Sequence, residues 1–272
     1  MPEGDTILRT ARTLARVLEG HAIAKFRSPL PGLSHAALEG RTVVRVEPRG
    51  KHLLVRFDDG RVLHSHMRMM GSWHVYRPGE IWRKPASRAR AVLETEAFVA
   101  VCFNAPVVEL LSPNDLVRHP SLSRLGPDVL SPRFDASLAR ERLRARPELS
   151  IGEALLTQSA LAGIGNIYKS EALFVTRTFP FLAVGGLSDA ELDGVVTAAQ
   201  HLLSANVERG GNARSTRRAL AGPRYWVYLR SGRPCLVCGT AVRMRRQGDA
   251  GRSTYWCPAC QKDPSNPPRV TP

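Results

Sequence analysis

Four of the five cysteines fall into two close pairs near the C-terminus, and their spacing is the clearest chemical pattern in the sequence. Each pair is a Cys-x-x-Cys, and eighteen residues separate the pair Cys235 and Cys238 from the pair Cys257 and Cys260. Four thiolates in this arrangement suit one tetrahedral Zn²⁺ ion with no open coordination position, which predicts a structural site. Two disulfides are the alternative, and a reducing compartment disfavours them. The fifth cysteine, Cys102, lies in the alternating run AFVAVCF, which predicts a buried core thiol.

The first residues, MPEGDT, offer a second candidate for chemistry. Proline suits the first turn of a helix, because it lacks the N–H that would otherwise be unpaired there. Alternatively, removal of Met1 leaves Pro2 with a secondary α-amine. An α-amine has a pKa of ~8 against ~10.4 for lysine, so it offers more free base at neutral pH. Glu3 is correspondingly either a favourable charge at a helix N-terminus or an acid/base beside that amine.

A glycine-rich turn in QSALAGIGNIYKSEALF provides a third pattern. Two helices are expected on either side of the turn, with Asn166 opening the second. Such a turn brings backbone N–H groups at a helix N-terminus close to an anion, although a plain helical hairpin explains the pattern nearly as well. Between the cysteine pairs, RMRRQGDAGRSTYW predicts a β-hairpin that holds several arginines against phosphates.

The overall charge also indicates a polyanionic partner. Lysine and arginine number 39 against 24 acidic residues, which gives a net charge of +15 and a pI near 10.6. Nucleic acid is the simplest such partner, and a solvated basic surface is the alternative. No apolar run approaches the ~20 residues of a membrane span, and the charged N-terminus does not resemble a signal peptide. We therefore expect no membrane partner and a cytoplasmic location.

The hydrophobic pattern predicts how these candidate residues are positioned. Apolar residues at helical spacing indicate a helix up to Leu18, with Gly20 at its C-terminal cap. From residue 21 to 112 the period changes to two, which predicts at least six short strands and a hairpin turn in FDDGRV. Helices follow, one opening on Asp135 and one on a capping box of Ser188 and Glu191.

The expected fold class is α+β. An antiparallel β-sandwich with a leading helix comes first, then a helical region, and then a zinc ribbon. The predicted segments are a sandwich domain at 1–112, a connection at 113–131, a helical domain at 132–222, a four-cysteine hairpin at 223–262 and a disordered tail at 263–272.

Four motifs occur in the order and spacing of one known family: MPEGDT, RGKHLL, GIGNIYKSEALF and GRSTYWCPACQ. The chain resembles the bacterial formamidopyrimidine-DNA glycosylase and endonuclease VIII family, and it is most similar to the endonuclease VIII branch of actinobacteria. The resemblance runs from Pro2 to about Gln261. It implies that the helical region is a helix-two-turns-helix domain and that one structural zinc ion binds to the ribbon.

The resemblance also implies an activity: a glycosylase and abasic-site lyase of base excision repair, acting as a monomer on damaged double-stranded DNA. Pro2 corresponds to the nucleophile that attacks C1′ and forms an iminium link, and Glu3 to the acid/base. Lys51 corresponds to a lysine that contacts phosphate and donates a proton in β-elimination. Arg252 corresponds to the hairpin arginine that grips phosphates and assists δ-elimination.

Other residues match family positions that hold DNA. Asn166 and Arg124 correspond to DNA-positioning residues. The loop HMRMMGSW, with Arg68, Met69 and Met70, corresponds to the loop that fills the void left by a flipped nucleotide. A place in the hydrophobic core is the alternative for the two methionines.

The sequence departs from the family pattern in three places. Thr6 stands where a second glutamate is common. Arg68 and Met70 differ from the residues of well-known endonuclease VIII enzymes, and the segment at 212–232 is too short for the long loop that caps 8-oxoguanine. The last departure favours oxidised pyrimidines as substrates. The alternatives are an 8-oxoguanine and formamidopyrimidine glycosylase, or a non-catalytic DNA-binding relative.

Overall fold

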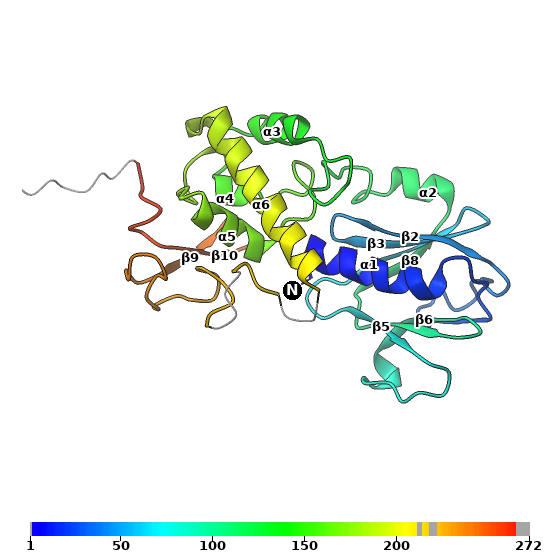
Figure 1. Ribbon diagram of the computed structural model, residues 1–272. Helices are drawn as coiled ribbons and strands as arrows, with labels where there is room; N and C mark the ends of the chain where they lie inside the picture. The colour runs from blue at the N-terminus through cyan, green and yellow to red at the C-terminus, as the bar shows by residue number, and fades with distance from the viewer. Residues whose placement is uncertain (1, 211–213, 218–221, 265–272) are drawn as a thin grey trace, which may run out of the picture. The chain divides into compact units, whose positions relative to one another are not determined.

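The computed structural model describes residues 2–210, 214–217 and 222–264 (Figure 1). The chain divides into two compact units, Met1–Arg124 and Leu125–Pro272, called here the first and second units. The division falls within the segment 113–131, which also contains a short helix, α2 (Pro113–Arg118), opened by a capping box of Ser112 and Asp115. Most of the tail predicted at 263–272 lies outside the described residues.

The leading helix is α1 (Gly4–Leu18), whose apolar side packs into the core of the first unit. Glu3 is its N-cap, with extended backbone, so Pro2 precedes the cap. The interpretation of Pro2 as the first helical residue is therefore wrong. At the other end Glu19 is the C-cap, and Gly20 follows it with φ 78°, a conformation that glycine adopts without strain.

Two antiparallel four-stranded sheets make up the rest of the first unit (Figure 1). One has the strand order β2-β3-β4-β8 and the other β1-β6-β7-β5, which confirms the predicted sandwich. The first sheet contains β2 (Val43–Arg49), β3 (His52–Phe57), β4 (Val62–His66) and β8 (Val107–Leu111). The second contains β1 (Lys25–Arg27), β5 (Ser72–Tyr76), β6 (Ala89–Glu94) and β7 (Val99–Phe103), with a 3-10 turn at Ala86–Arg88. Sequence reasoning missed β1, which has only three residues, and β8, whose VVELL pattern does not alternate.

The period-two alternation gives the first sheet a core face and an outer face. Leu53, Val55 and Phe57 pack in the core with α1 and the second sheet, and Cys102 is buried there as predicted. Burial raises the pKa of the Cys102 thiol. The predicted Asp-Gly turn joins β3 to β4, with Gly60 at φ 84°. The resulting register pairs Leu54 with His64 on the outer face.

The second unit is built on helices: α3 (Ala136–Arg144), α4 (Ile151–Ala154), α5 (Asn166–Val175) and α6 (Asp189–Arg209), with a 3-10 turn at Val184–Gly186. Asp135 caps α3 through a bond from the N–H of Leu138, and Ser188 with Glu191 forms the predicted capping box. Leucines, valines and Tyr168 from α3, α5 and α6 form one shared core.

One predicted helix is much shorter than expected. The apolar pattern of residues 151–161 predicts a helix, yet α4 ends at Ala154. The side chain of Gln158 donates to the carbonyls of Leu156 and Ile164 and accepts from the N–H of Gly163. These bonds compete with helical ones and fold the chain into the glycine-rich turn instead.

The last element is the predicted β-hairpin of β9 (Arg243–Gln247) and β10 (Arg252–Trp256), paired in antiparallel register. Phe174 of α5, Val227 and Tyr255 of β10 share a small core with two of the cysteines. Among the described residues, no helix is long and apolar enough to cross a membrane.

Candidate active site and metal centre

The N-terminal segment places a buried carboxylate immediately behind Pro2. Glu3 is fully buried, and its carbonyl accepts the N–H groups of Thr6 and Ile7 at 2.9 and 3.1 Å. Its side chain makes no capping hydrogen bond to the helix, unlike Asp135 or Ser188. The Glu3 carboxylate therefore does not serve as the helix cap.

Lys51 lies in a two-residue turn between β2 and β3. Arg49 pairs with His52 across the turn, which leaves Gly50 and Lys51 as its central residues. Gly50 has φ 60°, as the first position of a two-residue hairpin turn requires. The lysine is half-buried, and its backbone is fixed by the strands on both sides.

The loop after β4 turns its apolar side chains outward. Met67 is buried in the core, but Met69 and Met70 are 61% and 72% exposed. The core interpretation of these two methionines is therefore wrong. A Cβ on Gly71 would lie 2.6 Å from the carbonyl oxygen of Met67, so only glycine allows the turn to close this tightly. Arg68, with φ 44°, is also exposed.

The first unit thus contains Pro2, Glu3, Lys51, the Arg68–Met70 loop and Arg124, which is exposed at the end of the unit. Asn166, Arg252 and the four cysteines belong to the second unit.

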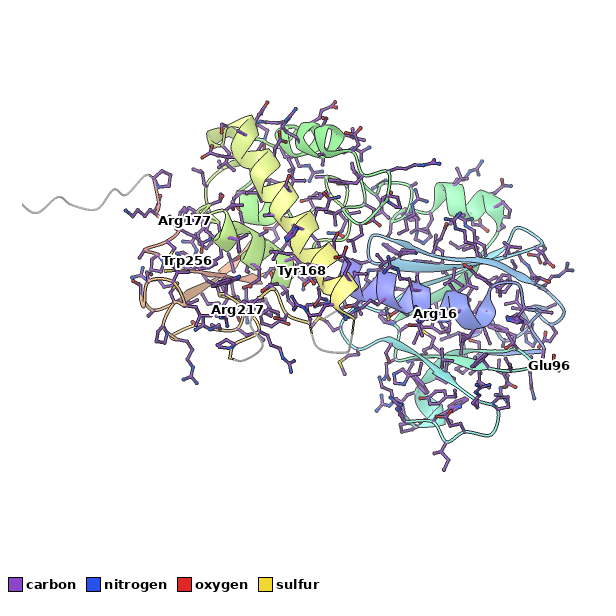
Figure 2. The ribbon with its side chains drawn as sticks, viewed as in Figure 1. Arg16, Glu96, Tyr168, Arg177, Arg217 and Trp256 are labelled. Carbon is purple, nitrogen blue, oxygen red and sulfur yellow. The ribbon has the colours of Figure 1, made fainter. Side chains whose placement is uncertain are left out.

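Within the second unit, the structure brings Asn166 against the hairpin. Its amide donates to the carbonyl of Ser253 at 2.6 Å. Lys169, one turn further along α5, is fully buried and donates to Thr254 Oγ1 at 2.6 Å. Figure 2 labels Tyr168 and Trp256, which belong to the two elements that these bonds join. The bonds set the position of the neighbouring Arg252 relative to α5.

The hairpin carries several exposed cations. Arg252 is exposed at the start of β10, and the exposed residues of β9 include three more arginines, Arg243, Arg245 and Arg246. The guanidinium of Arg245 lies 3.6 Å from the centre of the Phe181 ring. Gln247 is buried at the end of β9 and bonds to Thr254 and to the carbonyl of Pro180. The hairpin therefore has a buried polar anchor and exposed arginines on both of its faces.

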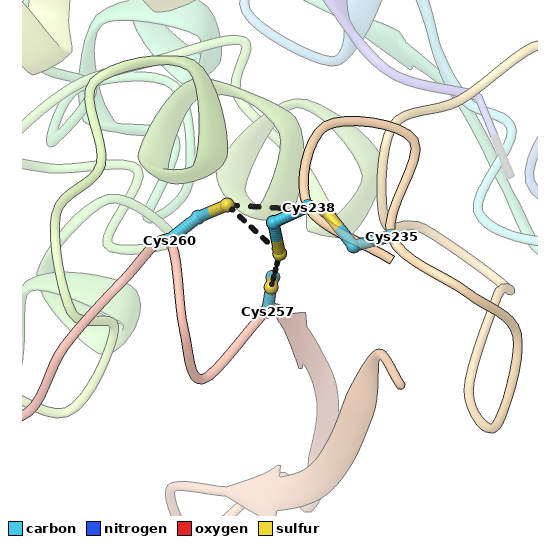
Figure 3. A group of neighbouring side chains, drawn as sticks. All are labelled: Cys235, Cys238, Cys257 and Cys260. Atoms are coloured by element: carbon cyan, nitrogen blue, oxygen red, sulfur yellow. Dashed lines mark hydrogen bonds between the residues drawn. The ribbon is translucent and has the colours of Figure 1, made fainter. Parts of the chain in front are cut away.

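The four predicted cysteines converge on one point (Figure 3). Cys235 and Cys260 sulfurs are 3.9 Å apart, Cys238 and Cys257 are 3.4 Å apart, and Cys238 and Cys260 are 3.5 Å apart. Tetrahedral zinc with bonds near 2.3 Å requires sulfur separations of about 3.8 Å. The donor set and its geometry therefore fit one zinc ion.

Without a metal ion, the pKa values of the cysteine thiols are shifted in opposite directions. Hydrogen bonds from Thr240 lower the pKa of Cys238 to about 6. Burial, together with the neighbouring thiols, raises the pKa of Cys257. A bound divalent cation reverses the second effect and deprotonates coordinating thiols. A zinc ion would thus balance four sulfurs that otherwise repel one another as thiolates.

Three family domains match this chain. Residues 1–106 match the formamidopyrimidine-DNA glycosylase N-terminal domain, residues 125–218 match the H2TH domain of the same glycosylase, and residues 232–262 match the zinc finger found in that glycosylase and in isoleucyl-tRNA synthetase. A "Probable endonuclease 8 2" of Streptomyces coelicolor is 44% identical over 98% of this chain and 96% of its own length. The chain belongs to the formamidopyrimidine-DNA glycosylase and endonuclease VIII family.

Other relatives agree with this assignment. The "DNA-(apurinic or apyrimidinic site) lyase Nei2" of Mycolicibacterium smegmatis is 37% identical over 96% of this chain and 99% of its own length. A solved structure of Lactococcus lactis formamidopyrimidine-DNA glycosylase, bound to DNA with an abasic site, has a TM-score of 0.81 at 24% identity and shares the fold. It covers 96% of this chain and 100% of its own. The prediction of an enzyme, a DNA glycosylase and lyase, is thus confirmed at the level of the family.

Sequence reasoning missed a buried carboxylate in the family motif GIGNIYKSEALF. Glu171 is fully buried and accepts the backbone N–H groups of Trp226, Val227 and Tyr228 at 2.7 to 2.9 Å, as well as the hydroxyl of Thr216. Burial raises its pKa, although these donors oppose the rise. One side chain of α5 therefore holds the segment that leads into the zinc-binding region.

A cluster of histidines on the outer face of the first sheet was also missed. His52 Nδ1 lies 2.8 Å from His64 Nε2, and His64 Nδ1 lies 2.7 Å from Glu109 Oε1. The spacing of His64 and His66 in RVLHSHM indicates a shared strand face, but only the pairing of β3 with β4 brings His52 to them. Burial lowers the pKa of His52 to about 3 and that of His66 to about 4.

We expect Cys257→Ser to lose both the zinc ion and DNA binding. Folding of the ribbon is coupled to the metal, so the hairpin that carries Arg252 should lose its shape. Metal analysis of the purified protein and binding to an abasic-analogue duplex test this. Cys102→Ala is the matched control, because this thiol lies in the core of the first unit, and it should keep one zinc ion per chain. A zinc-free wild type, or a Cys257→Ser protein that binds normally, contradicts the prediction.

Stability should fall as the pH drops below 6.5, in part through His52. Its pKa is 6.5 in an unfolded chain but about 3 in the folded protein, so between these values only the unfolded state takes up the proton. The free energy of unfolding then decreases by up to about 1.4 kcal/mol per pH unit from this residue.

Urea unfolding at pH 7.5 and pH 5 measures this effect. His52→Gln should have a smaller loss between the two pH values than the wild type, whereas His35→Gln, at an exposed histidine, should match the wild type. Equal pH dependence in the wild type and His52→Gln would show that burial of His52 carries no such cost.

Proposed function

We propose that this protein is a bifunctional enzyme of base excision repair. It removes oxidised bases, mainly pyrimidines, and cleaves the abasic strand by β,δ-elimination through a Schiff base on Pro2. The observation that carries this proposal is at the N-terminus, where Pro2 immediately precedes Glu3, the fully buried N-cap residue of α1. After Met1 is removed, the proline nitrogen becomes a secondary amine outside the hydrogen-bonding pattern of α1.

In this proposal the amine of Pro2 attacks C1′ of the damaged nucleoside and expels the base. Glu3 acts as acid and base during sugar opening, since a carboxylate next to the nucleophile in sequence is suited to move protons. The resulting iminium is an electron sink that acidifies C2′. Lys51 handles a proton in the β-elimination, and Arg252 assists the δ-elimination by holding the flanking phosphates.

Two observations support pyrimidine lesions as substrates. The relatives at 44% and 37% identity are named as an endonuclease 8 and as an abasic-site lyase. The segment at 212–232 is short, and its residues 212–213 and 218–221 lie outside the described part of the chain. The competing candidate, an 8-oxoguanine and formamidopyrimidine glycosylase, draws support from Lactococcus lactis formamidopyrimidine-DNA glycosylase bound to DNA with N7-benzyl-Fapy-dG, at 25% identity and a TM-score of 0.80.

The proposed partner is damaged double-stranded DNA, bound by a monomer. The exposed arginines of the hairpin, together with Asn166 and Arg124, bind the phosphate backbone of the DNA. The Arg68–Met70 loop enters the space left by the flipped nucleotide, where its two exposed methionines stack as flexible apolar wedges. One zinc ion holds the hairpin in shape and takes no part in the chemistry. The protein acts in the bacterial cytoplasm, at the nucleoid.

Borohydride trapping should give a covalent protein–DNA adduct that maps to Pro2. Duplexes with thymine glycol, 5-hydroxyuracil and dihydrouracil should trap well, and 8-oxoguanine poorly. Mass spectrometry of the N-terminal peptide identifies the linked residue. An uncleaved N-terminal extension should abolish trapping, because it blocks the amine. Glu3→Gln should slow base excision more than cleavage of a preformed abasic site.

The outcomes separate the competing functions. Efficient trapping on 8-oxoguanine alone favours the purine-specific glycosylase. DNA binding without any trapped lesion favours the non-catalytic relative. An adduct on a lysine leaves the lyase activity in place but removes the role proposed for Pro2.

DNA affinity should depend steeply on salt. If about five phosphates are neutralised, log K falls against log salt with a slope of roughly −4 to −5. Arg252→Ala should weaken binding and reduce the slope by about 1. Fluorescence anisotropy with an abasic-analogue duplex measures both, and Arg90→Ala, at an exposed arginine of β6, serves as the matched control. A salt-independent affinity contradicts the proposed basic surface.

A further inference from the structure

The histidines of the first unit form a directed chain of hydrogen bonds. It runs from His52 on β3 through His64 on β4 to Glu109 on β8, with distances of 2.8 and 2.7 Å. His119, at the end of α2, reaches the same carboxylate oxygen at 2.9 Å. His52 and His64 are 7% and 1% exposed, so water has little access to either bond. Buried polar groups that water cannot reach are expected to form short, well-oriented hydrogen bonds with one another.

The partners fix the position of each proton. His119 Nδ1 accepts the backbone N–H groups of Ser121 and Leu122, so its proton is on Nε2 and points to Glu109. A carboxylate can only accept, so His64 also carries its proton on Nδ1. Neutral His64 then has a lone pair on Nε2, which accepts from His52 Nδ1. Every donor in the chain points toward Glu109.

His52, the first residue of this hydrogen-bond chain, directly follows Lys51 in the sequence. The turn between β2 and β3 has only two central residues, so the direction of the lysine follows from where His52 is held. His66 packs against the His52 ring with centres 4.6 Å apart, and its Nδ1 accepts the N–H of Arg68 at 3.2 Å. The cluster therefore touches the two segments of the first unit that carry Lys51 and Arg68.

We propose that His52, His64 and Glu109 are positioning residues for Lys51, which hold the turn so that the lysine amine is aimed at the abasic sugar. The inference rests on the role proposed above for Lys51. The hydrogen-bond chain gives the turn a rigid support that Gly50 and Lys51 alone could not provide. Such support matters because a displacement of about 1 Å can cost a hundredfold in rate.

A metal ion is the competing explanation for the cluster. His64, Glu109 and His119 each offer a ligand atom, and these atoms lie within 4.8 Å of one another. However, a metal on His119 Nε2 would move the proton of that ring to Nδ1, where two backbone N–H groups already point. Hydrogen bonding satisfies all of these groups, and metal binding does not.

Nitrogen NMR of the imidazole rings tests the direction of the chain independently of any activity. At pH 7.5, His52 and His64 should be protonated at Nδ1, and His66 and His119 at Nε2. In His64→Phe, which fills the same space without nitrogen, His52 should lose its hydrogen-bonded Nδ1 proton. A wild-type His64 protonated at Nε2, or a second equivalent of zinc bound by wild type but not by His64→Phe, overturns the proposal.

Cleavage of a preformed abasic site in single turnover tests the positioning. His64→Phe should slow cleavage on the order of tenfold, with affinity for an abasic-analogue duplex unchanged. Glu109→Gln keeps the acceptor oxygen and should retain most of the rate, whereas Glu109→Leu should behave like His64→Phe. His35→Phe, at an exposed histidine of the same unit, should match the wild type.

A double-mutant cycle with Lys51→Ala separates positioning from general damage to the fold. If His64 acts through Lys51, adding His64→Phe to Lys51→Ala should produce no further loss of rate. Additive losses overturn the positioning role while the proposed function stands. If Lys51→Ala is as fast as the wild type, the positioning role fails too, and trapping at Pro2 then decides whether the lyase mechanism survives.

Discussion

A buried polar side chain must have hydrogen-bond partners, and this requirement fixes the segments that carry most of the proposed site. Leaving such a group unpaired costs about 1 to 3 kcal/mol, so the chain folds where partners are available. In the second unit, the amine of Lys169 and the amide nitrogen of Asn166 on α5 find acceptors on β10, at Thr254 and Ser253. The hairpin is thereby held on the helix, and Arg252 at its edge takes a defined position although it is itself exposed.

The same helix organises a second segment by the same means. Glu171 gathers three consecutive backbone N–H groups, at residues 226–228, which lie just before the first cysteine pair. A buried carboxylate that accepts several backbone N–H groups is held in place by them without a cationic partner. α5 thus binds the chain before the first cysteine pair and again between the two pairs, and a zinc ion would join the two pairs to each other. We therefore expect zinc binding and the packing of the hairpin on α5 to be coupled.

In the first unit the constraint acts across a sheet. The core face of β3 and β4 contains leucines and valines, and the outer face of these strands contains histidines that bond to one another and to Glu109. Neutral histidines can both donate and accept, which lets three strands be connected by one continuous chain of bonds. The cost is sensitivity to acid, because a protonated ring has no lone pair to accept with. The turn with Lys51 ends at His52, and the loop with Arg68 begins after His66, which packs against the His52 ring.

The sequence by itself determined the features that depend on local spacing. The four zinc ligands, the strands β2 to β7, the caps at Asp135 and Ser188 and the hairpin turn at Gly60 all follow from residues close together in the chain, and the structure contains each of them. The tertiary structure alone decided which distant residues meet. His52 reaches His64 only through the register of β3 and β4, and Glu171 finds its donors some 55 residues away. It also decided that α4 stops after one turn and that Met69 and Met70 face outward. Which distant segments come into contact depends on how the whole chain packs, and no local sequence pattern specifies that packing.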